Sequence, residues 1–384
     1  MKHFKHAVLP LMLLSSSAFS QSTVTLYGVI DEGVDYTSNS GGHAVFDLQS
    51  GYLQGSRWGL IGAEDLGGGM KALFQLENGF DLNSGRLGQG GRMFGRQAYV
   101  GIQSNQFGTV TLGRVYDSVV DFVAPMTAAG SWGGYVFGHP LDNDNTLNSF
   151  RLNNAIKYTS NVYGGFSFGG EYAFSNQTSF SNNRAYSFGA QYVGGPVTVG
   201  AAYLQADNPG ANSGGALAGP LNSSSVDTNF SALRQRVWGA GISYKLPAAT
   251  LNFAYTHTDL ASPTGTSYFG AFEVTPASLK YDNFELNALY QFTPALYFSA
   301  MYTYTTAKFN ATNEKAKPKW HQAGLMADYA LSRRTDVYAQ AVYQKRTGDS
   351  TGVSAIDNAY IPGANGFSNS ARQFVLRVAL RHKF

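Results

Sequence analysis

The sequence of 384 residues contains no cysteine, few charged residues and no long hydrophobic run. The lack of cysteine excludes disulfide bonds and thiol nucleophiles. Charged residues make up 13% of the chain, against roughly 25% in ordinary globular proteins. No apolar run approaches the ~18 residues of a transmembrane helix. These absences argue against a disulfide-linked secreted domain and against a helical membrane protein.

The first twenty residues have the pattern of a secretory signal peptide. Lys2 and Lys5 precede an apolar stretch at 7–14, and small residues stand at Ala18 and Ser20, where a signal peptidase would read them. The stretch is too short to span a membrane. We predict a signal peptide at 1–20 and an exported chain at 21–384. Removing two lysines from 27 basic residues leaves 25 against 24 acidic ones, so the charge balance gives no indication of a nucleic-acid partner.

Glycine and aromatic residues are abundant: the chain has 45 Gly, 24 Tyr and 26 Phe. Segments of alternating polar and apolar residues recur, separated by turns that are alternately short and long. The short turns lie at 65–69, 105–108, 162–165, 194–196, 246–249, 292–294 and 331–335. The long loops are centred on 37–50, 83–91, 115–152, 175–183, 206–233, 260–279, 308–317 and 346–371.

Seven short turns and eight long loops separate sixteen strands. The strand windows match the roughly 9–11 residues that cross a bilayer. Short turns on one side and long loops on the other are typical of outer-membrane barrels. The sequence therefore predicts an all-β, 16-stranded antiparallel transmembrane β-barrel that forms a single domain over 21–384.

The chain ends in a strand that runs to its last residue. Alternation divides it into an apolar face and a face that carries Arg377 and Arg381. The apolar face consists of Phe374, Leu376, Val378, Leu380 and Phe384. This pattern fits a barrel strand with lipid outside and water inside, so both arginines are expected to face the lumen.

Several segments of the mature chain resemble the general, trimeric porins of Gram-negative bacteria. They are Val24–Gly28, Ser56–Ala72, Arg96–Gly101, Phe107–Arg114, Asn154–Thr159 and Leu380–Phe384. The resemblance implies an outer-membrane location, a homotrimer surrounded by lipid and lipopolysaccharide, and a third long loop folded into the pore as a constriction. It also implies that the C-terminal strand is recognised by the barrel-assembly machinery, with Phe384 as the assembly signal.

Pores of this kind select ions by charged groups at their narrowest point. Trp58 and its alternating apolar neighbours suit the outer face of the second strand, which turns Arg57 inward. Tyr99 and Gly101 suit the outer face of the fourth, which turns Arg96 inward. By resemblance, the basic wall of the constriction consists of Arg57, Arg96, Arg114, Arg151 and Lys157.

The acids expected opposite this wall are few. The candidates are Asp117, Asp121, Asp142 and Asp144 on the third loop, with Glu77 on the third strand. No acid lies between 122 and 141, where the loop tip is expected. A basic wall that faces an acid-poor tip favours anions. We therefore predict a general diffusion porin for small hydrophilic solutes and ions that prefers anions.

Three alternatives stay open at this stage. Trp132, Tyr135 and Phe137 on the third loop leave room for a substrate-specific channel. An adhesin that acts through the long loops could coexist with a pore. A barrel enzyme is disfavoured, because the scattered histidines form no acid–base or nucleophile set. The sequence predicts no catalytic residues, no metal site and no cofactor.

Overall fold

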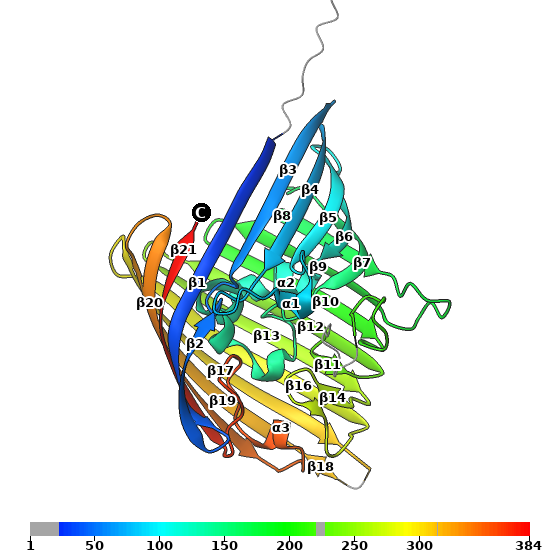
Figure 1. Ribbon diagram of the computed structural model, residues 1–384. Coiled ribbons are helices and arrows are strands. Elements are labelled where there is room, and N and C mark those ends of the chain that lie inside the picture. The colour runs from blue at the N-terminus through cyan, green and yellow to red at the C-terminus, as the bar shows by residue number, and fades with distance from the viewer. Residues whose placement is uncertain (1–22, 220–226, 313) are drawn as a thin grey trace, which may run out of the picture.

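Sixteen strands form one closed, antiparallel barrel in the computed structural model, which describes residues 23–219, 227–312 and 314–384 (Figure 1). The predicted signal peptide lies outside the described residues. The barrel strands are β1 (Thr23–Ser40), β3 (Arg57–Gly67), β4 (Met70–Gly79), β5 (Gln97–Ser104), β6 (Gly108–Val115), β7 (Leu152–Thr159), β8 (Phe166–Ala173), β9 (Arg184–Gly194), β10 (Val197–Asp207), β12 (Arg234–Lys245), β13 (Ala249–Ala261), β16 (Ser278–Gln291), β17 (Leu296–Asn310), β19 (Pro318–Ala330), β20 (Thr335–Gly348) and β21 (Arg372–Lys383). The predicted fold class and strand number are confirmed.

The first and last strands close the barrel. β1 pairs with β21 from Val29 opposite Lys383 to Thr37 opposite Val375. Gly28 and Phe384 exchange two backbone hydrogen bonds of 3.0 Å. A Cβ atom on Gly28 would lie 2.3 Å from the Phe384 ring, so this contact requires glycine. The last residue of the chain is therefore part of the closure itself.

The first predicted loop, at 37–50, is wrong. β1 continues to Ser40 and turns into an additional strand, β2 (His43–Ser50), that pairs back along it. β3 occupies the same edge of β1 over Thr23–Val29, and β2 takes over from Glu32. Alternation alone did not distinguish this long hairpin from a polar loop, because its residues are Ser, Asn, Gly and Asp as well as apolar ones.

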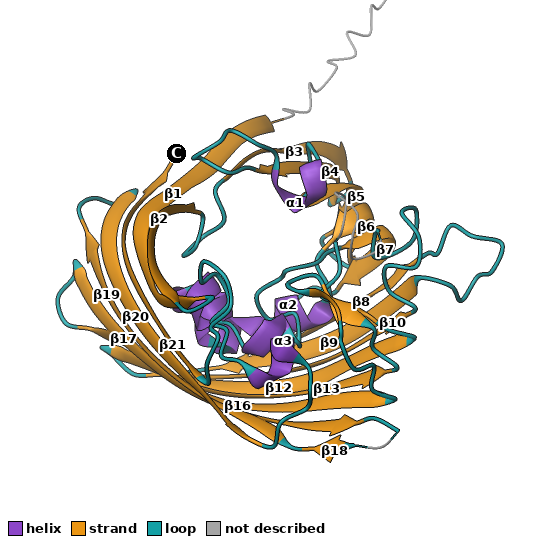
Figure 2. Ribbon diagram, turned by 60° about the horizontal axis from the view of Figure 1, so that its bottom comes forward, coloured by secondary structure: helices purple, strands orange, loops and turns teal. Residues whose placement is uncertain are grey.

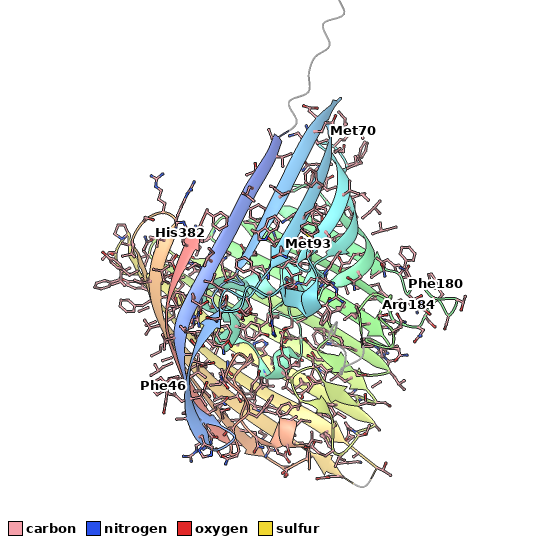
Figure 3. The ribbon with its side chains drawn as sticks, in the orientation of Figure 1. Phe46, Met70, Met93, Phe180, Arg184 and His382 are labelled. Atoms are coloured by element: carbon pink, nitrogen blue, oxygen red, sulfur yellow. The ribbon has the colours of Figure 1, made fainter. Side chains whose placement is uncertain are left out.

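Alternation along the strands separates an outer face from an inner one. On β21 the exposed side chains are Leu376, Val378 and Leu380, whereas Val375, Arg377 and Ala379 are buried on the inside. Figure 3 shows His382 near the end of the barrel where the C-terminus lies, with Phe46 toward the opposite end. Within the described residues, none of the helices has the length and apolar character needed to cross a membrane.

Short helical and strand elements occur in the long loops. They are α1 (Gly88–Gly91), α2 (Ser118–Phe122), η1 (Ala124–Met126), η2 (Ala129–Gly133), η3 (Tyr135–Phe137), η4 (Pro140–Asp142), α3 (Ser354–Asp357) and the two-residue strands β11 (Phe230–Ser231), β14 (Gly265–Thr266), β15 (Gly270–Ala271) and β18 (Lys315–Ala316). Figure 2 shows α2 and α3 within the ring of strands. The segment between β6 and β7 adds Val119, Leu141 and Phe137 to three separate buried clusters, so the loops provide the apolar core.

Candidate functional site

The segment 116–151, which we call the inner loop, is bonded to the inner wall of the far strands. The backbone amide of Ala128 donates to Glu285 on β16 at 2.6 Å, and the Trp132 indole donates to Asn287 at 3.1 Å. Gln322 on β19 and Gln340 on β20 donate to backbone carbonyls of the loop at 3.0 and 2.7 Å. These hydrogen bonds join the inner loop to strands more than 150 residues further along the chain. They fix the loop against the inner wall of the barrel.

Asp117 holds the start of the inner loop. Its Oδ1 accepts from the amides of Val119 and Val120 at 2.8 and 3.3 Å and so caps α2. Its Oδ2 accepts from the Asn145 side chain at 2.6 Å, which ties the two ends of the loop together. Burial raises the pKa of Asp117 to about 6. The carboxylate is fully buried, so it positions the loop and does not line a water-filled space.

A buried histidine fastens the middle of the inner loop. Nδ1 of His139 lies 2.6 Å from Asp144 and Nε2 lies 3.0 Å from Glu285. Burial lowers the pKa of His139, but the Asp144 and Glu285 carboxylates outweigh it and raise the pKa to about 10. At neutral pH the ring is an imidazolium that bridges two carboxylates.

The two acids at the end of the loop do not face the basic wall. Asp142 accepts from the amides of Leu147 and Ser149, and Asp144 accepts from His139 and Thr146. Both carboxylates are fully buried. The expectation that they oppose the arginines across water is therefore not met, because the chain folds back on itself and both carboxylates bond to amides or side chains of the same loop.

A second inner segment, 51–56, supports the tip of the inner loop. The Tyr135 amide donates to the Tyr52 carbonyl at 2.6 Å, and the two rings stack 5.6 Å apart. Between them Gly134 has φ 68°, and a Cβ there would lie 2.2 Å from the Tyr52 oxygen, so only glycine fits. Asp31 accepts from the amides of Leu53 and Gln54 at 3.0 and 2.9 Å and holds this segment against β1.

Arg377 lies behind the same segment. Its guanidinium is 2.6 Å from Asp35 and 2.9 Å from Asp31, and it stacks over the Tyr52 ring at 4.8 Å. The residue faces inward, as alternation predicts, yet it is 1% exposed. It is a buried structural ion pair and not a free charge on the pore wall.

Two members of the predicted basic wall, Arg57 and Arg96, meet at Glu77 near the end of β4. Its Oε1 accepts from Arg96 at 2.8 Å and from Tyr116 at 3.2 Å. Its Oε2 accepts from Tyr27 at 2.9 Å and lies 3.6 Å from Arg57. One carboxylate thus serves two guanidiniums. A further chain of hydrogen bonds runs from Tyr99 through Gln75 to Tyr27, at 2.7 and 2.6 Å.

The prediction that Tyr99 lies on the outer face and so turns Arg96 inward is wrong, although the Arg96 guanidinium does reach the inner side. On β5 Val100 and Ile102 are exposed on the outer face, while Tyr99 hydrogen-bonds on the inner face. Arg96 precedes β5, which begins at Gln97, so strand alternation does not set its direction. The hydrogen bonds from Arg96 to Glu77 and Tyr116 set the direction of its side chain.

Lys157 on β7 forms a second charged contact with the inner loop. Its ammonium donates to the Tyr116 carbonyl at 2.8 Å and forms a close ion pair with Asp121. Asp121 is the most exposed acid of the inner loop, with 30% of its side chain accessible. Of the predicted acids on the loop, it alone among the described residues pairs with the basic wall.

Comparison with known proteins agrees with this architecture. The family model described as Gram-negative porin matches residues 7–349. The chain belongs to the Gram-negative porin family.

Curated relatives match this porin over part of its length. An outer membrane porin of Bordetella pertussis is 35% identical over 170 residues, which cover 40% of this chain and 43% of the relative. Outer membrane porin protein 32 of Delftia acidovorans is 34% identical over 173 residues, covering 42% of this chain and 46% of the relative. The chain thus spans less than half the length of the curated relatives it matches.

Solved structures share the fold over nearly the whole porin. An anion-selective porin from Comamonas acidovorans has a TM-score of 0.70 at 24% identity, covering 95% of this chain and 100% of that one. The trimer form of OmpT from Vibrio cholerae has a TM-score of 0.65 at 16% identity, covering 94% and 99%. At these identities the likeness shows the fold alone.

Two predicted members of the basic wall of this porin are deeply buried. Arg114 is 2.5 Å from Asp227 and donates to Asn153 at 2.6 Å. Arg151 lies over the Tyr116 ring at 5.7 Å and forms no ion pair among the described residues. Burial, followed by the positive charge of Arg96, lowers the pKa of Arg151 to about 10, so it stays charged at neutral pH.

Several residues of the site were not predicted from the sequence. Tyr27 and Tyr116 carry no charge, and Asp227 lies far away in the 206–233 loop. Glu285 and His139 stand on separate segments with no motif between them. The inward parity of Glu285, shared with Asn283 and Asn287, was the one signal that pointed to it.

Proposed function

We propose that this protein is an outer-membrane diffusion porin for small hydrophilic solutes and ions. A 16-stranded barrel is wider than its own wall side chains can fill, which leaves an aqueous channel. The inner loop narrows that channel beside Glu77, Arg57 and Arg96. No chemistry is required of these residues: they set the local field through which solutes pass.

The charge balance of the constriction supports a preference for anions. Lys157 has Asp121 and Arg114 has Asp227 as single partners. Arg57 and Arg96 share Glu77, and Arg151 forms no ion pair among the described residues. Counted by ion pairs alone, five cations stand with three carboxylates. Glu77 shared between two guanidiniums is the observation that carries the proposal.

Reversal potential across a salt gradient in a planar bilayer tests this preference. We expect permeation of chloride over potassium, and Arg96→Glu should move the potential toward cations because it changes the local charge by two. Arg96→Lys is the matched control, since it keeps the charge. A cation-selective wild-type channel would refute the anion preference, and the absence of any conductance would refute the porin function.

A substrate-specific channel is less well supported than general diffusion. Phe137 is fully buried, and Trp132 packs edge-on against it at 4.8 Å. The Tyr135 ring stacks on Tyr52. These rings attach the loop to the barrel wall and do not form a path for sugar rings. Saturable block of the current by one solute class would favour a substrate-specific channel over general diffusion.

Differences around the outer face support a homotrimer. The exposed large side chains of β1, β5 and β6 are aliphatic, whereas those of β8–β20 include many aromatics. The first set is Val24, Leu26, Val100, Ile102, Val110 and Leu112; the second includes Phe168, Phe188, Trp238, Phe253, Phe284 and Tyr302. Aromatic girdles mark lipid contact, so the aliphatic face of β1, β5 and β6 is the one for subunit contact. Three equal closing steps in single-channel recordings test this assignment.

The two ends of the chain and the outer face of the barrel serve export, assembly and lipid contact. The exposed Phe384 at the end of β21 is the signal read by the barrel-assembly machinery, and the signal peptide 1–20 directs export. Lipid and lipopolysaccharide cover the outer face. The protein is a channel and not an enzyme.

A further inference from the structure

Four large side chains give the wall of the lumen an apolar patch on the short-turn side of Glu77. They are Tyr27 on β1, Ile61 on β3, Leu73 on β4 and Tyr99 on β5, and we call them the lumen patch. The inside of an outer-membrane barrel is ordinarily polar. Single apolar residues are common on any wetted surface, but these four stand together on neighbouring strands.

Strand pairing places the lumen patch on the inner face of the barrel. Ile61 is directly opposite Gln75, which is directly opposite Tyr99. Residues directly opposite one another on paired strands share a face. Gln75 accepts from Tyr99 and donates to Tyr27, which in turn donates to Glu77. Ile61 is 44% exposed on this face, so it meets the water of the channel.

Two glycines make room for the side chains of the patch. A Cβ atom on Gly59 would lie 2.7 Å from the Tyr27 hydroxyl, and one on Gly101 would lie 3.1 Å from Cδ1 of Leu73. Tyr27 and Leu73 therefore lie against backbone that carries no side chain. The hydrogen bonds of the Tyr27 and Tyr99 hydroxyls hold both rings in place, and groups that are already fixed lose little freedom when a ligand binds.

Arg57 provides a cation at one edge of the lumen patch. It faces inward from β3 four residues before Ile61, which is about 13 Å along a strand. Its Nε lies 3.6 Å from Glu77, whereas Nε of Arg96 lies 2.8 Å from the same carboxylate. The Arg57 side chain is also the more exposed of the two, at 21% against 12%. Arg57 is thus the more loosely held guanidinium and has donors to offer an anion.

We propose that Arg57 and the lumen patch bind small aromatic monocarboxylates as these solutes pass through the channel. The carboxylate accepts hydrogen bonds from Arg57, and the ring packs against Tyr27 and Ile61. Contact between aromatic rings is favourable beyond the burial of apolar area, so the site prefers a ring to an aliphatic body. A second carboxylate would lose its hydration against apolar side chains. The inference rests on the proposed porin function, which puts solutes in the lumen.

Ligand-observed NMR on the detergent-solubilised protein tests the site, with benzoate as the probe. A channel must also release its solute, so we expect a dissociation constant in the millimolar range. Acetate, benzamide and cyclohexanecarboxylate lack the ring, the charge and the aromatic character respectively. Each should bind at least about threefold more weakly than benzoate.

Ile61→Ala should weaken the binding of benzoate at least about threefold, because it removes apolar contact area. Ile242→Ala is the matched control: Ile242 is 43% exposed on the outer face of β12, and the variant should bind benzoate like wild type. Bi-ionic reversal potentials in planar bilayers give a second readout. The permeability ratio of benzoate to cyclohexanecarboxylate should fall in Ile61→Ala and not in Ile242→Ala. Only folded protein forms open channels, so this ratio reports on folded protein alone.

The outcomes separate this site from the porin function. Equal binding of benzoate and acetate, or of benzoate to wild type and Ile61→Ala, would overturn the proposal. Cyclohexanecarboxylate bound as tightly as benzoate would overturn the assignment of aromatic ligands. A channel that conducts chloride but fails these binding tests would still be a porin. A protein that binds benzoate as expected but conducts no ions would contradict the porin function and leave the site standing.

Discussion

Nε2 of His139 lies 3.0 Å from Oε2 of Glu285, which joins the middle of the inner loop to a strand on the far side of the barrel. Both side chains are almost fully buried, and Nδ1 of the same ring is bound to Asp144. The position of the inner loop thus depends on an ion triad that is buried within the protein.

Removing one member of this triad should loosen the inner loop. Glu285→Gln leaves a buried imidazolium with one carboxylate, and breaking a buried ion pair costs about 3–5 kcal/mol. We expect more frequent brief closures and greater current noise in single-channel recordings. Asp259→Asn, the same type of change on the outer face, is the control. Quiet, wild-type-like currents from Glu285→Gln would show that the other loop bonds suffice.

The same triad predicts how the loop responds to pH. The folded pKa of His139, about 10, lies above the ordinary value of 6.5. Its stabilisation is therefore complete below pH 6.5 and is lost as pH rises through about 10. Current noise recorded from pH 5 to pH 10.5 should be lowest at the acid end and rise most steeply toward pH 10. The His139→Gln variant should lack this alkaline rise; an identical rise in the variant would contradict the assignment.

Glu77→Gln should strengthen the preference for anions. It removes the carboxylate shared by Arg57 and Arg96 and leaves their charges in place. One unit charge about 5 Å from a passing ion, even in water, changes its energy by about 0.8 kcal/mol. We expect the chloride-to-potassium permeability ratio to rise at least about threefold at low salt. Glu64→Gln, an exposed acid on β3, is the control, and an unchanged ratio in Glu77→Gln would argue against this constriction.

Arg377 should contribute strongly to stability. Arg377→Leu leaves Asp31 and Asp35 buried without their counter-charge, which costs about 3–5 kcal/mol. Arg377→Lys keeps the charge but loses the planar stack on Tyr52 and the two-pronged contact, so it should fall between wild type and Arg377→Leu. The urea concentration at half-unfolding measures the order. Arg372→Leu, on the exposed outer face of the same strand, should unfold like wild type.

Deleting Phe384 should lower the amount of inserted protein without altering its selectivity. The deletion removes the two backbone bonds to Gly28 and the proposed assembly signal but leaves Glu77, Arg57 and Arg96 in the chain. Outer-membrane yield and reversal potential measure the two effects separately. Phe384→Tyr keeps the terminal aromatic and the backbone and should insert normally. A changed reversal potential in the deletion protein would mean that closure also shapes the constriction.

The strand plan was readable from the sequence because its signals are local. Alternation, turn residues and the apolar face of 374–384 depend on neighbours within a few positions. The seven short turns lie where strands end in the structure. The hairpin at 37–50 was missed because its polar composition hides its pairing, which only β1 as a partner reveals.

The sequence by itself determined the sixteen-stranded barrel, the length of the inner loop and the residues able to form a basic wall. Only the tertiary structure decided which of those charges are free. It buried Asp142, Asp144 and Arg377 in hydrogen bonds and ion pairs within the protein, and it gave Arg57 and Arg96 a single shared acid. The physical reason is that pairing depends on which strands lie opposite one another and where a long loop folds back. Neither is encoded in the spacing of residues along the chain.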